Sequence, residues 1–242
     1  MLMTFVMHRV VEGAPLEWTD VSSSMLKDML DGIRDNGLPV TTAAAWRGER
    51  AVCLSFDDGS QSDYSIVCPE LAARGLRATF FIVPEWVGTT GYLDWTQIRE
   101  MHDAGMEIGS HGLAHLHMSR LPRAEAWQEF DVSKKRIEDR LGSPVSTFAY
   151  PFGDHAGWCH RLGLEAGYRR LCSSRPGLAR HSDSILPRVS VNRRHTKADL
   201  SRLIELDPMY LRWLHMFDRS RAIAKAVLGK QAYVRLRNSL FR

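Results

Sequence analysis

Short apolar runs alternate with amphipathic stretches along this chain. The apolar runs are rich in β-branched and aromatic residues, a composition typical of strands buried in a parallel sheet. They cover residues 2–7, 51–56, 78–83, 106–109, 146–150, 168–172 and 185–191. Because each run is followed by a stretch that can form a helix or a turn, the pattern predicts an α/β fold.

Amphipathic helices are expected between these strands. In residues 21–36 one face is apolar and Gly37 follows as a C-terminal stop; that face consists of Met25, Leu26, Met29, Leu30 and Ile33. Further helices are expected at 62–74, 96–104, 122–141 and 158–166. We therefore predict a distorted parallel (β/α) barrel with about seven strands. An open doubly wound sheet is the alternative, although no G-x-G-x-x-G follows the first strand.

Length and charge suggest one barrel with an appendage. A chain of 242 residues is within the range of a single α/β barrel, and we expect a catalytic barrel in residues 1–207 and a helical basic tail in 208–242. Seven of the 32 basic residues and none of the 28 acidic residues follow Asp218. The basic pI therefore belongs to the tail and gives no evidence that the body binds nucleic acid. A tail helix packed on the barrel is one interpretation, and contact with anionic lipid or another polyanion is the other.

The N-terminal segment and the cysteines favour a cytoplasmic protein. Residues 1–7 lack a charged region and a cleavage site, and no apolar segment is long enough to span a bilayer. The four cysteines form no C-x-x-C pair, which fits a reducing compartment. We expect a soluble protein, with membrane association through the basic tail as an alternative.

Two adjacent carboxylates follow the strand expected at 51–56, in Ser55-Phe56-Asp57-Asp58-Gly59. A glycine-assisted turn just past the strand can direct both side chains into one pocket. Taken alone, such a sequence is commonly a turn with a capping aspartate.

Two histidines stand four residues apart, at His111 and His115, after the strand expected at 106–109. If this segment makes a helical turn, both rings can face one ion. His8 and Pro151-Phe152-Gly153 follow other strands, and reactive groups of barrels gather at the carboxyl ends of strands. One carboxylate and two imidazoles suit catalytic zinc or a non-haem iron oxygenase. A second acid beside the ligands favours metal-assisted hydrolysis.

Three segments resemble the signature motifs of the metal-dependent polysaccharide deacetylases, carbohydrate esterase family 4, over about residues 50–190. They are Ser55-Phe56-Asp57-Asp58-Gly59, Ser110-His111-Gly112-Leu113-Ala114-His115 and Phe148-Ala149-Tyr150-Pro151-Phe152-Gly153. The resemblance implies a distorted barrel that removes N-acetyl groups from an amino-sugar polysaccharide or glycoconjugate, using zinc or another divalent metal such as cobalt, nickel or manganese. It implies Asp57 as the base and the Phe152 N–H as an oxyanion donor, with the metal held by Asp58, His111 and His115.

At two positions the chain departs from the family pattern, and other residues are candidates for the missing roles. Ala149 stands where an arginine usually orients the base, and Arg188 is our candidate for that task. The Leu-x-His motif that usually supplies the acid late in the chain is absent. Val6-Met7-His8, near the N-terminus, resembles that motif. Such a permuted order resembles the exopolysaccharide deacetylases. We therefore predict His8 as the acid, with His117 as a rival and a purely structural His8 as the alternative.

Aromatic residues near the expected active end could stack on sugar faces. Trp86, Tyr92, Trp95 and Trp158 are candidates, although packing in the core is the commoner fate of tryptophan. We predict a substrate-binding set of Trp95, Tyr150, Pro151 and Arg188. Hydrolysis of acetyl esters or small amides on the same site, and a non-catalytic sugar-binding module, are the alternatives to an N-deacetylase of exopolysaccharide biosynthesis.

Overall fold

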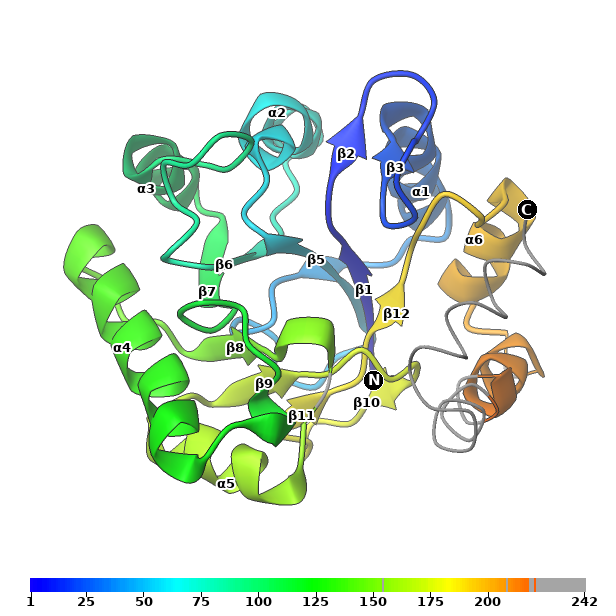
Figure 1. Ribbon diagram of the computed structural model, residues 1–242. Helices are drawn as coiled ribbons and strands as arrows, with labels where there is room; N and C mark the ends of the chain where they lie inside the picture. The colour runs from blue at the N-terminus through cyan, green and yellow to red at the C-terminus, as the bar shows by residue number, and fades with distance from the viewer. Residues whose placement is uncertain (154, 208, 218–219, 221–242) are drawn as a thin grey trace.

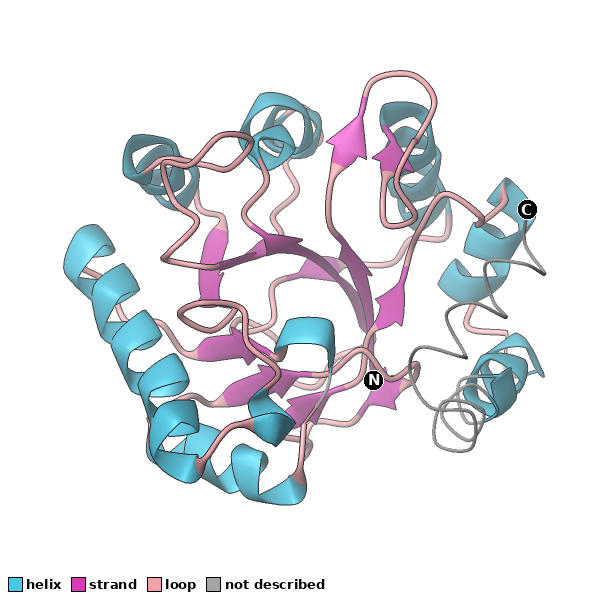
Figure 2. Ribbon diagram, in the orientation of Figure 1, coloured by secondary structure: helices cyan, strands magenta, loops and turns pink. Residues whose placement is uncertain are grey.

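A strongly curved, mostly parallel β-sheet forms the centre of the molecule, and helices surround it (Figures 1 and 2). The computed structural model describes residues 1–153, 155–207, 209–217 and 220. Along the sheet the strand order is β10 (Leu178–Ala179), β1 (Leu2–Met7), β5 (Ala51–Asp58), β6 (Thr79–Ile82), β7 (Glu107–Ser110), β8 (Thr147–Ala149), β9 (Arg170–Cys172) and β11 (Ile185–Leu186). Only the β1–β10 pairing in this order is antiparallel. The predicted distorted barrel is confirmed.

The strands are apolar without alternation because both of their faces are covered. Every residue of β1 and β6 is buried, and so are the first seven residues of β5. One face fills the interior of the barrel and the other meets the surrounding helices, which is the usual arrangement of a parallel sheet. Minor strands are β2 (Val10–Val11), β3 (Val21–Ser22) and β4 (Val40–Thr41); β2 pairs with β3, and β4 with β5.

The first helix illustrates why these sequences form helices here. In α1 (Ser23–Asp35) the Ser22 hydroxyl accepts a hydrogen bond from the Met25 N–H, and the apolar face predicted from the sequence is turned inward. The remaining helices are η1 (Asp63–Val67), α2 (Cys68–Ala72), α3 (Trp95–Asp103), η2 (Met118–Arg120), α4 (Arg123–Leu141), η3 (Pro151–Gly153), α5 (Gly157–Glu165) and α6 (Lys197–Ile204). The helix expected at 62–74 is instead a π-helical turn followed by a short α-helix.

The strand expected at 185–191 is two strands. Residues of β11 pair with β9, whereas β12 (Val189–Ser190) pairs with β1 on the other side of the opening. Pro187 lies between them and cannot donate a ladder hydrogen bond, so the pairing changes partner at this point. The segment therefore joins the two edges of the barrel (Figure 1). Arg188, which lies between β11 and β12 in the sequence, is at this seam.

Residues 209–217 form a helix beyond α6. Most of the predicted basic tail, residues 221–242, lies outside the described residues. Within the described part of the chain, no helix combines the length and apolar character needed to cross a bilayer.

Candidate metal centre and active site

Asp57 and Asp58 lie within β5, not in a turn after it. They are in register with Phe81 and Ile82 of β6. Regular alternation would point the two carboxylates to opposite sides, but Asp58 has a left-handed backbone with φ of 81°. As a result both acids approach the same imidazole: His111 Nε2 is 3.7 Å from Asp57 Oδ2 and 3.5 Å from Asp58 Oδ1.

The segment from His111 to His115 is an irregular loop rather than a helical turn, and both rings nevertheless face Asp58. Gly112 and His115 both have positive φ, 79° and 58°. The buried Glu129 carboxylate, from α4, accepts hydrogen bonds from the N–H groups of Leu113 (2.8 Å) and Ala114 (3.1 Å). A Cβ on residue 112 would lie 2.7 Å from Glu129 Oε2, so the loop requires glycine there. Glu129 thus fixes the loop that carries both histidines.

Asp58, His111 and His115 form a three-residue cluster suited to a metal ion. One donor atom from each lies within 4.8 Å of the others, and His115 Nε2 is 3.5 Å from Asp58 Oδ1. The ring nitrogen Nδ1 of His111 is 2.8 Å from the Ala149 carbonyl oxygen. Nδ1 therefore carries the hydrogen, and the lone pair of Nε2 faces Asp58.

The unsatisfied atoms of this cluster fit a cation. Asp58 Oδ1 is buried and has no hydrogen-bond partner among the described residues, an arrangement that calls for a ligand. Burial, reinforced by the negative charge of Asp57, raises the pKa of Asp58 to about 6. Burial also lowers the pKa of His111 to about 3 and that of His115 to about 4, so both imidazoles are neutral donors at neutral pH. A carboxylate and two neutral imidazoles are a ligand set that divalent zinc accepts.

Arg188 holds Asp57 in a buried, bidentate ion pair. Its Nη1 and Nη2 lie 2.7 Å and 2.8 Å from the two carboxylate oxygens, and its Nε donates to the Ser173 carbonyl at 3.0 Å. Burial alone would raise the pKa of Asp57, but the charges of Arg188 and His111 outweigh it and hold the pKa at about 2. The completely buried Arg188 side chain thus contacts Asp57, the residue that it was predicted to orient, and its contact with substrate stays a prediction.

His8 follows β1 and borders the acids. A positive charge on this half-buried side chain lowers the pKa of both Asp58 and Asp57. Its buried Nδ1 has no hydrogen-bond partner among the residues that the structure describes. The strand therefore brings a histidine from the N-terminal end of the sequence to the cluster.

Aromatic rings surround the ligand His115. Its ring centroid is 4.8 Å from that of Trp86 and 4.5 Å from that of Phe152. Trp86 in turn contacts Tyr92, and Phe152 stacks on His117 with centroids 3.8 Å apart. Phe152 has φ of 60° and is 57% exposed. The rings of Trp86 and Phe152 therefore hold His115 from two directions.

The other predicted substrate residues are Tyr150, Pro151 and Trp95. Tyr150 is completely buried against Phe148, and Pro151 is buried beside Gly112, 3.4 Å from the ideal position of its Cβ. Trp95 packs between helices, under the guanidinium of Arg140. The side chains of Tyr150 and Pro151 thus fill space behind or beside the site, and contact of these three residues with substrate stays a prediction.

A fourth acid near the cluster was not predicted from the sequence. Asp63, the first residue of η1, is fully buried, and neither carboxyl oxygen has a hydrogen-bond partner among the described residues. Burial and the nearby charges of Asp58 and Asp57 raise its pKa well above the usual value. Asp63 lies among polar residues at the start of a helix, so nothing in the sequence indicates that its side chain is buried.

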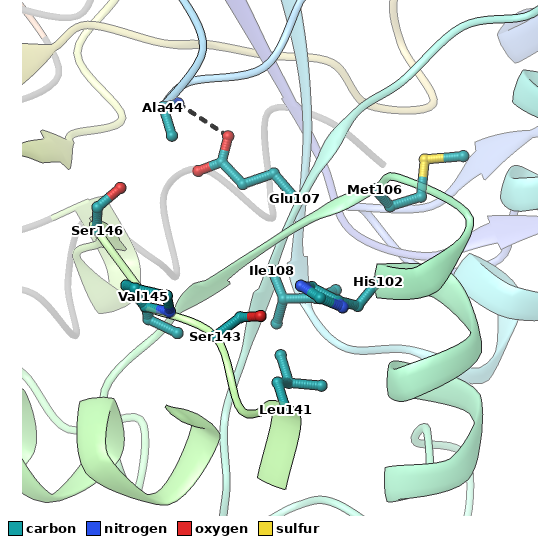
Figure 3. A pocket seen from close by; sticks show the side chains of 10 residues that line it. Ala44, His102, Met106, Glu107, Ile108, Leu141, Ser143, Val145 and Ser146 are labelled. Atoms are coloured by element: carbon teal, nitrogen blue, oxygen red, sulfur yellow. Dashed lines mark hydrogen bonds between the residues drawn. The ribbon is translucent and has the colours of Figure 1, made fainter. Parts of the chain in front are cut away.

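A pocket at the opposite end of the barrel is structural. Its lining precedes β7 and β8, away from the carboxyl ends of the strands. Figure 3 shows the Glu107 carboxylate directed at Ala44, whose N–H lies 2.8 Å from Oε2. The hydroxyls of Thr79 and Thr147 donate to the same carboxylate. Its hydrogen-bonding capacity is thus used to tie together the amino ends of the strands.

Comparisons with known proteins agree on one family. The family model described as polysaccharide deacetylase matches residues 45–171. A poly-beta-1,6-N-acetyl-D-glucosamine N-deacetylase of Escherichia coli is 33% identical over 234 aligned residues, covering 74% of this chain and 35% of that protein. The chain spans 52% and 35% of the lengths of the first two curated relatives it matches.

Solved structures share the fold. The deacetylase PplD of Streptococcus pyogenes, solved with acetate, has a TM-score of 0.75 and 18% identity, with 84% of this chain and 97% of that one covered. IcaB of Ammonifex degensii has a TM-score of 0.71 and 21% identity, with 88% and 97% covered. At these identities the likeness establishes the barrel alone.

Proposed function

The chain belongs to the polysaccharide deacetylase family, and from this premise we propose that it removes N-acetyl groups from an amino-sugar polysaccharide or glycoconjugate of the exopolysaccharide type. The observation that carries the proposal is the placement of the Asp57–Arg188 pair beside Asp58, His111 and His115. A relative that acts on an N-acetylglucosamine polymer, by its name, supports the substrate class.

Asp58, His111 and His115 would hold a divalent cation, zinc being the ion that the ligand set favours. When bound, such a cation polarises a carbonyl group and acidifies water. The hydrogen bond from His111 to the Ala149 carbonyl keeps that ligand in the required tautomer.

Asp57 is the proposed general base. Arg188 keeps its carboxylate ionised at neutral pH and fixes both oxygens, one of which lies 3.7 Å from His111 Nε2. A base that is positioned beside the ligand set can accept the proton of an attacking water. Nη1 of Arg188 also donates to the Ser55 hydroxyl at 3.3 Å, and Nε donates to the Ser173 carbonyl, so the guanidinium is itself held in place.

His8 is the proposed general acid. An amine leaves an amide only after it gains a proton, and general acid catalysis of this kind contributes about 10² to 10⁴ in rate. A charge on His8 acts on both Asp58 and Asp57, and its Nδ1 has no hydrogen-bond partner among the described residues; both observations support this role. The N–H of Phe152, at the exposed turn η3, is the proposed donor to the oxyanion.

Metal analysis combined with product analysis tests the proposal. We expect about one zinc or similar ion per chain, and release of acetate from N-acetylglucosamine oligomers that a chelator abolishes. Asp58→Asn should lose both metal and acetate release. Bound metal with cleavage of acetyl esters but not of the oligomers would replace the N-deacetylase proposal with an esterase, and sugar binding without acetate release would indicate a binding module.

A further inference from the structure

The helix formed by residues 209–217 has two apolar faces. Leu211 and Leu214 are turned toward the body of the protein. The opposite face carries the aromatic stripe, which we define as Met209 (80% exposed), Trp213 (52%), Met216 (71%) and Phe217 (44%). At 100° per residue these four side chains share one arc of the helix, so they form a continuous apolar surface in contact with solvent. Such a patch normally marks an interaction site.

The aromatic rings of this helix stack on one another. Tyr210 stacks on Trp213 with centroids 5.7 Å apart and an interplanar angle of 14°, and Trp213 stacks on Phe217 at 5.3 Å and 11°. The three rings are therefore nearly parallel and stacked in a row, and their edges form a flat surface. Flat aromatic surfaces of this kind suit the boundary between lipid headgroups and acyl chains, where tryptophan and tyrosine are enriched.

Charge identifies the class of partner. Arg212 is exposed next to the stripe, and after Asp218 the sequence contains seven basic residues and no acidic residue. Basic residues near an anionic membrane surface are attracted to its headgroups. A second copy of the chain would bring two such basic segments together and repel, which disfavours a homodimer through this face.

We propose that the aromatic stripe docks on an anionic lipid surface, with the basic residues of the flanking sequence attracting the headgroups. The binding mode is that of an interfacial amphipathic helix, with a buried apolar face and adjacent positive charge. This inference is independent of the proposed catalytic activity.

Vesicle co-sedimentation of the full chain tests the proposal. We expect binding to vesicles of phosphatidylcholine with roughly 30% phosphatidylglycerol and much weaker binding to phosphatidylcholine alone. Raising the salt from about 0.1 M to 1 M shortens the Debye length from about 10 Å to 3 Å and should weaken binding. The triple variant Trp213→Ser, Met216→Ser, Phe217→Ser should lose about tenfold or more in partition coefficient, and Trp213→Ser alone should lose part of this.

The control is Trp127→Ser, which removes a comparably exposed tryptophan from α4 (37%) and should bind as the wild type does. Unfolding midpoints and metal content establish that the variants are folded. Failure of the wild type to sediment with anionic vesicles would overturn the proposal, whatever the variants do. Equal binding by the triple variant, or a wild-type dimer that this variant converts to a monomer, would also overturn it.

Discussion

Three residues of the candidate site have backbone conformations that side chains other than glycine rarely adopt. Asp58, His115 and Phe152 have φ of 81°, 58° and 60°. Each such conformation costs of order 1–3 kcal/mol and persists only where the surroundings enforce it. Here they turn one carboxylate toward a histidine, one imidazole toward that carboxylate, and one aromatic ring onto His117. The local strain is thus concentrated where the donor atoms must converge.

Replacement of His8 tests the assignment of the acid. We expect His8→Ala to leave metal content unchanged and to lower kcat for N-acetyl substrates by about 10² to 10⁴, because the amine would leave unprotonated. Activated acetyl esters, whose leaving group needs no proton, should be hydrolysed almost as fast. Steady-state kinetics on both substrates check this, with His102→Ala as a surface control; an equal loss on both substrates would contradict the assignment.

Removal of the cation that holds Asp57 should change how stability depends on pH. In the wild type the folded pKa of about 2 lies below the usual 3.8, so the pair stabilises the fold above about pH 4 and loses this effect as pH falls through 2. In Arg188→Met burial raises the pKa of Asp57, so stability should fall as pH rises, by about 3–5 kcal/mol at pH 7.

Urea unfolding at pH 4 and pH 7 measures the effect of the Arg188 substitution. Arg180→Met, at an exposed position, is the matched control and should follow the wild-type pH dependence. A variant at position 188 that gains stability between pH 4 and pH 7 would show that the ion pair does not govern this carboxylate.

Helix α4 contacts the loop of the candidate metal site through one carboxylate. Glu129 fixes the loop between His111 and His115 by accepting two backbone hydrogen bonds. Glu129→Gln should therefore weaken metal affinity by about 10- to 100-fold, as is usual for partners behind the ligands. Competition with a fluorescent chelator measures this, and Glu125→Gln, exposed one turn earlier in α4, should bind metal as the wild type does. Unchanged affinity in Glu129→Gln would assign Glu129 to folding alone.

The packing of α5 on the sheet depends on a glycine. A Cβ on Gly163 would lie 2.4 Å from a methyl group of Leu171 in β9 and 3.1 Å from the ring of Phe130. Gly163→Ala should destabilise the fold by about 1–3 kcal/mol through overpacking. Gly157→Ala, in the same helix with open space around it, should be neutral or stabilising by up to about 1 kcal/mol. Chemical denaturation of both variants measures the contrast, and equal stabilities would refute the close packing.

Elements differ in how far the sequence determines them. The strand expected at 2–7 is β1 to the residue, because a run buried on both faces must be apolar throughout. The His111–His115 loop could not be predicted, because Glu129, which shapes it, lies 16 residues beyond Leu113 on another element. The sequence predicts Asp58 in a turn after the strand, but it lies inside a paired strand and has a left-handed backbone. Local sequence does not indicate such a combination, because it depends on the neighbouring strand. The motif resemblance supplied the ligand set, whereas the burial of Tyr150 and the helix contact of Trp95 depend on tertiary packing.

For the whole molecule, metal removal should lower thermal stability. An ion present at 100 times its Kd stabilises the fold by about 2.7 kcal/mol, and 1 kcal/mol corresponds to about 2–4 °C for a domain of this size. We therefore expect a chelator to lower the Tm by about 5–11 °C. Differential scanning calorimetry checks this, and Asp58→Asn should show no chelator effect. A wild-type Tm indifferent to both zinc and chelator would contradict a metal site.

The segment between β11 and β12 closes the barrel, because its two strands pair with opposite edges of the sheet. Arg188 lies in the segment that bridges the two edges, and its partner Asp57 stands 131 residues earlier in the chain. If the seam parted while Asp57 stayed buried, its carboxylate would lose its counter-ion, at a cost of about 3–5 kcal/mol. We therefore expect partly open forms of the barrel to be rare, because the ion pair proposed to serve catalysis also holds the seam closed.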